Sequence, residues 1–304
     1  MRVLANTGTA FFNVGRDGAR GTAAVDGAFT WLEVEDFSQV GRDGGLGALN
    51  VTNGGAVDNF TAGSINETRI GANGTGTLNI ESGRTYTTKT LAIGNGGDGT
   101  VNVANGGRLV ADRTFNAARG TITGGGTIVG DITNAGGTIA AGSSPGLMNV
   151  LGNVDLLGGG TVEVELGGTV FDSGIPQFDY DRIDVSDDLA TTGDTEGTVT
   201  IDSGALFDID FFGVFTAGLG DTFDVIVADV IDVADLSSLI FDFTVAGLMS
   251  GLLWDIDIVS FGQGREALQL SVVSSVEVSE PTAMLILIGG VGVLAAIRRR
   301  RRVG

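Results

Sequence analysis

Four copies of a short motif recur in the first third of the sequence, and their spacing decides the fold. The copies are Val14-Gly15-Arg16-Asp17-Gly18, Val40-Gly41-Arg42-Asp43-Gly44, Ile70-Gly71-Ala72-Asn73-Gly74 and Ile93-Gly94-Asn95-Gly96-Gly97. Their second positions are all glycine and are separated by 26, 30 and 23 residues. Repeats of about 20 to 50 residues are typical of solenoids, because one unit cannot bury its own apolar face and must stack on the next.

Each copy is followed by a short segment in which apolar and polar residues alternate. The clear examples are Ala48-Leu49-Asn50-Val51, Thr77-Leu78-Asn79-Ile80 and Thr100-Val101-Asn102-Val103, and a turn-forming pair ending in glycine follows each of them. In a strand, this alternation places the apolar side chains on one face and asparagine on the other. We therefore predict an all-β fold, a right-handed parallel β-helix, with glycine and asparagine at its left-handed corners and asparagine ladders along the stack.

Short Gly-Thr-Ile steps continue this pattern beyond residue 120 and lead to Ala140-Ala141-Gly142-Ser143-Ser144-Pro145-Gly146. With the strand-like segments around it, this stretch resembles the β-helical passengers of autotransporter-type and PEP-CTERM-type proteins, over about residues 40–230. The resemblance implies a β-helical fold and placement at the cell surface. We assign residues 1–170 to the Gly/Asn-rich array, and we expect further repeats to precede residue 1.

The composition changes after residue 170. Residues 171–260 hold 19 acidic side chains and one basic one, Arg182. Alternation persists with aspartate at the polar positions, as in Leu206-Phe207-Asp208-Ile209-Asp210 and Trp254-Asp255-Ile256-Asp257-Ile258. We predict that residues 171–275 form an acidic, β-rich closing region, either a wider β-helical cap or a sandwich-like unit, because a solenoid must cover its last apolar rung.

The overall composition excludes several kinds of chemistry. The 304 residues include 52 Gly and 3 Pro, with no Cys and no His, which removes the usual zinc ligands, cysteine nucleophiles and the Ser-His-Asp triad. Of 17 basic and 37 acidic residues, five arginines lie at 298–302 and two glutamates at 277 and 280, so residues 1–275 carry 12 basic and 35 acidic side chains, a net charge of −23. We expect no nucleic-acid partner, because phosphate repels so acidic a body.

The C-terminal segment, residues 276–304, has the composition of a membrane tail. Residues 282–297 carry no charge, and five basic residues follow directly: Arg298, Arg299, Arg300, Arg301 and Arg302. As a helix this run spans about 24 Å, and snorkelling arginines with local thinning can adapt it to a hydrocarbon core of about 30 Å. The arginines stay in the cytoplasm by the positive-inside rule, which places the body outside it. We predict one short C-terminal transmembrane helix.

Ser279, Glu280 and Pro281 precede the apolar run, and the order of motif, apolar run and arginines resembles the PEP-CTERM sorting tail. Glu280 and Pro281 match the last two positions of that family's Pro-Glu-Pro motif, and Ser279 stands at the first. The resemblance implies cleavage near Glu280-Pro281 by an exosortase-type membrane protease in a Gram-negative bacterium that makes exopolysaccharide. It also implies export, an inner-membrane intermediate, and delivery to the cell surface or extracellular matrix, with exopolysaccharide as a candidate partner. Residues 1–14 lack the apolar run of a signal peptide, so we expect a missing N-terminal signal.

Candidate sites for chemistry are few. The densest acidic patch of the sequence lies beside Arg182 and comprises Asp172, Asp179, Asp181, Asp184, Asp187 and Asp188. Polysaccharide lyases and hydrolases use paired carboxylates or carboxylates with Ca²⁺, but we interpret this patch as a solvated strand edge and turn. Residues 94–100 match a Ca²⁺-binding β-roll motif only once, without the stacked repeats such sites require, so we expect at most weak surface binding of Ca²⁺. We assign no catalytic, cofactor or metal residue.

Three functions stay open on the sequence. We favour an exported, non-enzymatic structural or adhesive protein of the cell surface or extracellular matrix. The alternatives are a carbohydrate- or Ca²⁺-binding surface module and a polysaccharide lyase or hydrolase built on a β-helix.

Overall fold

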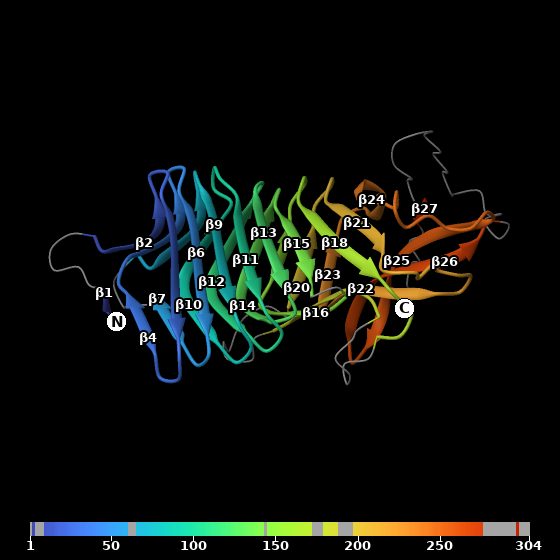
Figure 1. The fold of residues 1–304 in the computed structure, drawn as a ribbon. Helices are drawn as coiled ribbons and strands as arrows, with labels where there is room; N and C mark the ends of the chain where they lie inside the picture. Colours follow the sequence, from blue (N-terminus) through green and yellow to red (C-terminus); the bar gives the residue numbers. More distant parts are fainter. Residues whose placement is uncertain are drawn as a thin grey trace.

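A computed structural model describes residues 2–3, 9–59, 65–142, 145–171, 179–187, 197–275 and 296–297. Almost all of the regular structure in these ranges is β-strand, and the one helix among them is the three-residue 3₁₀ turn Leu236–Ser238. Figure 1 shows an elongated molecule in which successive segments of the chain lie side by side along one axis. The expected all-β fold is confirmed.

Nine parallel strands form the first face of the molecule, and each pairs with the corresponding strand of the next repeat. They are β3 (Arg20–Asp26), β6 (Leu46–Thr52), β9 (Thr75–Ile80), β11 (Gly99–Val103), β13 (Gly120–Gly124), β15 (Thr138–Ala141), β18 (Thr161–Leu166), β21 (Leu206–Phe211) and β24 (Ile240–Asp242).

The remaining strands form one larger sheet that provides two further faces. The second face contains β1 (Arg2–Val3), β4 (Trp31–Val34), β7 (Ala56–Asn59), β16 (Leu147–Leu151), β19 (Arg182–Ser186) and β22 (Thr222–Ala228). The third contains β2 (Phe11–Arg16), β5 (Phe37–Arg42), β8 (Glu67–Ala72), β17 (Val154–Leu156), β20 (Thr198–Ile201) and β23 (Val230–Val233). Three long strands run through both faces, namely β10 (Thr85–Ile93), β12 (Arg108–Ala117) and β14 (Thr127–Ala135).

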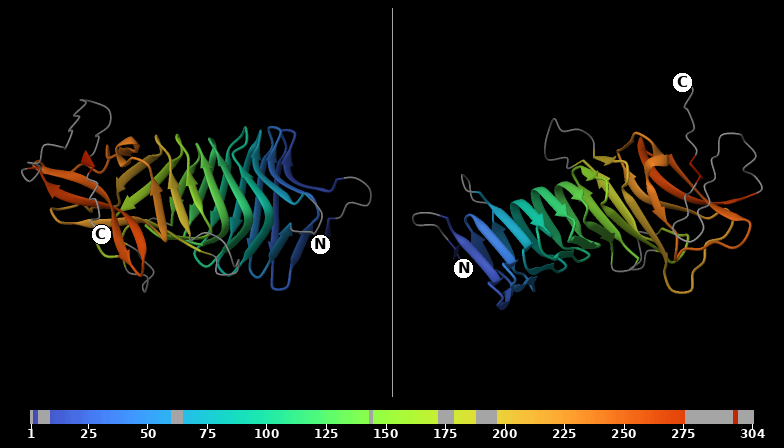
Figure 2. Two further views of the ribbon diagram at one scale, coloured as in Figure 1. Left: turned by 180° about the vertical axis from the view of Figure 1, so that it is seen from behind. Right: turned by 90° about the horizontal axis from the view of Figure 1, so that it is seen from above.

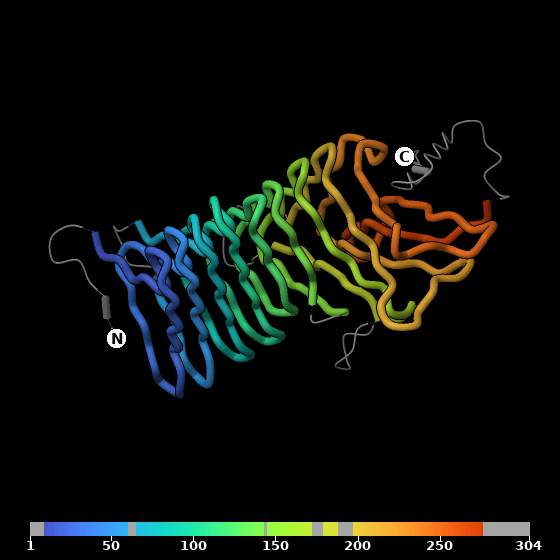
Figure 3. Tube along the Cα trace, turned by 45° about the horizontal axis from the view of Figure 1, so that its top comes forward, coloured from blue at the N-terminus to red at the C-terminus, as the bar shows by residue number. Residues whose placement is uncertain are grey.

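The chain visits the three faces in turn, for example β2, β3, β4 and then β5, so the molecule is a parallel solenoid resembling a β-helix. Figures 2 and 3 show these coils stacked along the long axis. The four motif copies identified in the sequence lie directly above one another, because Val14 pairs with Val40, Val40 with Ile70, and Ile70 with Ile93. The repeat alignment is therefore confirmed residue by residue.

The motif glycine is required at the corner where each of these strands ends. Gly41 has φ +70°, and a Cβ built on it would lie 2.0 Å from the backbone oxygen of Thr75 in the next coil. Gly15, Gly71 and Gly94 have the same left-handed backbone and an equally close neighbour. Both the backbone conformation and the contact between coils exclude a side chain here.

The alternating segments place their residues as predicted. Leu49, Leu78 and Val101 stack in register and are fully buried. The intervening asparagines face outward, and the side chain of Asn79 donates a hydrogen bond of 2.7 Å to the side-chain oxygen of Asn50. The predicted asparagine ladder is therefore present at this pair.

The parallel pairing continues past residue 170, and an antiparallel hairpin then ends the stack. Its strands are β25 (Leu252–Gly262) and β26 (Arg265–Ser274), and β26 pairs antiparallel with β22. Aromatic rings fill the space under the last coil, including a stacked pair, Phe243 and Trp254, with centroids 5.0 Å apart. Phe243 and Trp254 are buried and belong to the same apolar core as the coils.

The tail lies almost wholly outside the described residues. Two of its residues form β27 (Ala296–Ile297), whose backbone pairs with Asp255 and Ile256 of β25. The rest of the helix expected over 282–297 is outside the described ranges. Within those ranges, no helix has the length and apolar character needed to cross a membrane.

Candidate functional site

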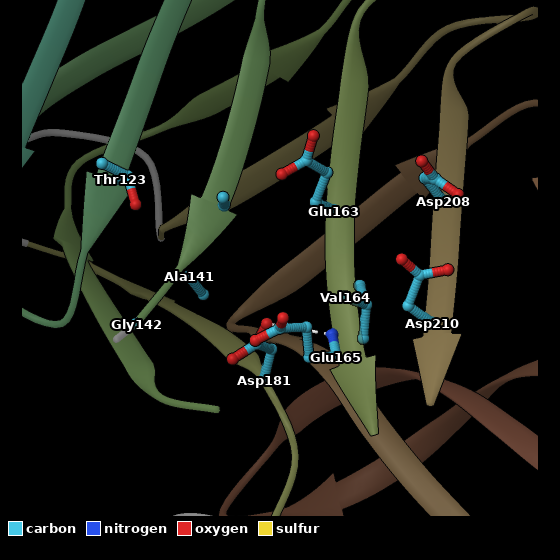
Figure 4. Close-up of a pocket in the computed structure, with 10 residues that line it drawn as sticks. Thr123, Ala141, Gly142, Glu163, Val164, Glu165, Asp181, Asp208 and Asp210 are labelled. Carbon is cyan, nitrogen blue, oxygen red and sulfur yellow. Dashed lines mark hydrogen bonds between the residues drawn. The ribbon is translucent and has the colours of Figure 1, made fainter. Parts of the chain in front are cut away.

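A hollow lined by acidic side chains lies on the first face, where uncharged residues of β13 and β15 meet carboxylates of β18 and β21. It encloses about 330 Å³. Its lining comes from β13, β15 and the residue after it, β18, β21 and the residue before β19. It comprises Thr123, Ala140, Ala141, Gly142, Glu163, Val164, Glu165, Asp181, Asp208 and Asp210. We call this feature the acidic hollow. Figure 4 shows carboxylates from neighbouring strands side by side within it.

Strand register brings these carboxylates together. Glu163 of β18 pairs with Asp208 of β21, and Glu165 pairs with Asp210. Neighbouring parallel strands lie about 4.8 Å apart, so each pair stacks like charges with no residue between them. Asp208 is in turn in register with Asp242 of β24.

The crowding changes how these groups titrate. Burial raises the pKa of Glu163, and the carboxylates of Asp208, Asp210 and Glu165 raise it further. Burial likewise raises the pKa of Asp208, with added contributions from Asp210 and Asp242. Asp242 at the end of the row behaves differently, because hydrogen bonds from Thr244 lower its pKa.

Asp181 is the most perturbed carboxyl of the hollow. Its residue is 3% exposed, and its two side-chain oxygens accept backbone N–H bonds from Gly146 at 2.6 Å and Glu165 at 2.9 Å. Burial raises its pKa from 3.8 to about 7; the two N–H bonds oppose this shift, and the carboxylates of Glu165 and Glu163 add to it. Asp181 is therefore partly protonated near neutral pH, unlike an ordinary aspartate.

Arg182, the next residue, does not neutralise the hollow. Its guanidinium lies 3.6 Å from the centroid of the Phe171 ring, and it donates to the Tyr180 hydroxyl at 2.8 Å and to the backbone oxygen of Asp224 at 2.9 Å. The side chain is buried and holds β19 against β22. It is a structural cation committed to other partners.

The described members of the acidic patch identified in the sequence do not converge on one site. Asp184 pairs with Arg265 of the closing hairpin at 2.6 Å, and Asp179 accepts a bond from the backbone of Val170 at 3.2 Å. The backbone of Asp187 donates to Asp229 at 3.1 Å. Asp172 and Asp188 lie outside the described residues. Among the described members of this patch, only Asp181 lines the acidic hollow, and its companions there come from elsewhere in the chain.

Sequence reasoning missed those companions, which are Glu163, Glu165, Asp208 and Asp210. Their outward orientation was recognisable, because each pair flanks one apolar residue in an alternating strand. Their proximity was not, because the strands that carry them pair across 45 residues, as Thr161 with Leu206, whereas the motif copies are only 23 to 30 residues apart. To place the four carboxylates together, one would have had to predict that β18 pairs with β21 and in which register.

Neither metal nor sorting sites are visible in the described part of the chain. Asp98 of the β-roll-like segment pairs with Arg119 at 2.6 Å, and the described residues contain no group of three or more acidic side chains arranged to hold a metal ion. Ser279, Glu280, Pro281 and the five arginines at 298–302 lie outside the described ranges.

Comparison with known proteins adds no relative: no protein-family model matches the chain, and no curated protein matches it.

Proposed function

We propose that this chain is an exported, non-enzymatic structural or adhesive protein of the bacterial cell surface or extracellular matrix. The observation that carries the proposal is the continuous parallel stack from β2 to β24, which makes a long body with columns of outward side chains. Such a body gives reach and a repetitive surface, which suit a scaffold. Its high negative charge favours solubility and repulsion between copies.

We further propose that the tail sorts the protein. Glu280-Pro281, the apolar run over 282–297 and the arginines at 298–302 follow one another as in substrates of exosortase-type proteases. In this proposal the tail holds the chain in the inner membrane as a short helix until cleavage delivers the solenoid to the surface, where exopolysaccharide is the candidate partner. The right-handed sense of the winding belongs to the same proposal.

The test is the intact mass of the protein recovered from the native cell envelope and from the medium. The proposal expects a mature chain that ends near Glu280 and lacks the arginines. A full-length chain in every fraction would contradict processing and remove the main support for surface sorting.

One observation bears on a second function, action on polysaccharides. A carboxyl with a raised pKa next to ionised carboxylates is the arrangement that glycoside hydrolases use, and Asp181 has such neighbours. However, Asp181 is buried and both of its oxygens are occupied by backbone N–H groups, so it is poorly placed to protonate a sugar. We expect no release of reducing ends from exopolysaccharide by the purified protein, and release that disappears in Asp181→Asn would favour the enzyme instead.

A further inference from the structure

Three consecutive residues tie three successive coils together beside the acidic hollow. Asp181 accepts bonds from Gly146, just before β16, and from Glu165 in β18. Arg182 reaches forward to the backbone and carboxylate of Asp224 in β22, and the Tyr180 hydroxyl bonds to Arg182. The coils around β16, β18 and β22 are thus connected through side chains in addition to the sheet pairing.

We propose that the acidic hollow is a proton-controlled joint between the turn before β16 and strand β18, which Asp181 holds together. With Asp181 neutral, the joint is closed and the turn at Gly146 and strand β18 are held together. Ionisation of Asp181 strengthens these two N–H bonds, but burial and the carboxylates of β18 and β21 oppose the charge more strongly, so ionisation weakens the joint overall.

The groups that face Asp181 explain why ionisation is unfavourable there. β18 contributes Glu163 and Glu165, and β21 contributes Asp208 and Asp210. β13, β15 and the turn that follows them contribute only uncharged residues, and none of the 10 lining residues is basic. Ionised Asp181 therefore adds one more negative charge to four existing carboxylates.

The direction of the pH effect follows from proton linkage. The pKa of Asp181 is about 7 in the folded chain against an ordinary value of 3.8, so the folded state binds a proton more tightly than the unfolded one. The stability that this proton contributes is fully present below the ordinary value and is lost as the pH rises through about 7. The joint is therefore closed in mildly acidic surroundings and weakened in alkaline ones.

The first experiment compares thermal unfolding of the full chain between about pH 5 and pH 9 with that of two variants. The side chain of Asp181→Asn does not titrate, so its melting temperature should fall less between pH 6 and 8 than that of the wild type. Glu81→Gln removes one exposed carboxylate far from the hollow and should follow the wild type. An Asp181→Asn profile as steep as that of the wild type would overturn the proposal.

A second variant decides the matter if Asp181→Asn does not fold. Glu165→Gln keeps the backbone N–H that Asp181 accepts and removes a carboxylate that raises the pKa of Asp181. The pH midpoint of the stability loss should therefore move downward in Glu165→Gln. A midpoint that stays in place or moves upward would contradict the joint.

Discussion

The coils from β2 to β13 (the early coils) and those from β18 to β24 (the late coils) share one parallel backbone arrangement, but they carry different side chains on their surface. A single column of residues on the first face shows this difference. The column runs in register through Asn50, Asn79, Asn102, Thr123, Ala140, Glu163, Asp208 and Asp242. At its amide end, stacked side chains bond to each other, as Asn79 does to Asn50. At its acidic end, stacked side chains repel, and burial with neighbouring charge raises the pKa of Glu163 and Asp208.

This difference shows that parallel stacking repeats the interaction between like side chains at every step of a column, whether that interaction is attractive or repulsive. An amide is both donor and acceptor, so identical copies satisfy one another at the strand spacing. A carboxylate only accepts, so identical copies need a proton or a cation between them. The early coils are therefore expected to be insensitive to pH and the late coils sensitive to it.

The largest effect is expected where the early coils touch most closely. Gly41→Ala forces φ +70° on a residue with a Cβ and places that atom 2.0 Å from the Thr75 oxygen, so we expect a loss of about 3–5 kcal/mol of unfolding free energy. Gly44→Ala has a similar backbone, φ +78°, but its Cβ would meet only the Gly18 nitrogen at 3.9 Å, an ordinary contact, and it should cost about 1–2 kcal/mol. Urea unfolding followed by circular dichroism measures both. Equal losses would show that packing between coils does not matter there.

A smaller effect is expected at the ion pairs of the late coils. Arg265 joins the closing hairpin to Asp184 at 2.6 Å and Asp229 at 3.0 Å, and all three side chains are partly buried. Arg265→Met should cost about 2 kcal/mol, since it leaves two partly buried carboxylates without their cation. The matched change in the early coils is Arg119→Met, where both partners are 58% exposed, and it should cost less than about 1 kcal/mol. The ratio of the two urea midpoint shifts is the measurement, and a larger loss at Arg119 would reverse the comparison.

Replacing an acid of the column by an amide should stabilise the protein, and replacing an amide by an acid should destabilise it. Asp208→Asn relieves the repulsion with Glu163 and should stabilise the protein by about 1 kcal/mol at pH 8. The gain should shrink as the pH falls towards the raised pKa of Asp208, where the wild-type residue becomes neutral. Asn79→Asp introduces a charge among amides and should cost about 0.5–1 kcal/mol at pH 8. Denaturant midpoints at the two pH values give these differences, and a destabilised Asp208→Asn at pH 8 would contradict the repulsive column.

Divalent cations should have the smallest effect. They screen the acidic end of the column, but the described residues offer no chelating set, so Ca²⁺ and Mg²⁺ should raise the melting temperature equally and by about 1 °C. A saturable rise with Ca²⁺ alone would instead favour the Ca²⁺-binding surface module.

The sequence predicted the early coils well, because each copy carries its own register mark. A left-handed glycine after an apolar residue can occupy only one corner, so aligning the motifs aligned Val14, Val40, Ile70 and Ile93 as the structure does. The late coils carry no such mark. β18 and β21 are far apart in the sequence. The pairing of Glu163 with Asp208 therefore depends on the register in which β21 joins β18.

The closing hairpin illustrates the same limit. The turn at Gly262 and Gly264 has the residues of a hairpin, and both glycines have left-handed backbones. Nothing local specifies that β26 joins β22 in an antiparallel direction, because that choice depends on the aromatic cluster beneath it and on Arg265. The strand pairing of the closing region depends on burial against residues that are distant in the sequence. The alternation of apolar and polar residues within one strand does not contain that information.

The most direct test of this account is amide hydrogen exchange of the full chain at pH 5 and pH 8, corrected for the intrinsic effect of pH and resolved by coil. We predict unchanged protection in β6, β9 and β11, whose column is amide, and reduced protection at pH 8 in β16, β18 and β21 around the acidic hollow. An equal loss of protection in both regions, or none in β18 and β21, would contradict the claim that column chemistry divides one solenoid into a pH-insensitive and a pH-sensitive part.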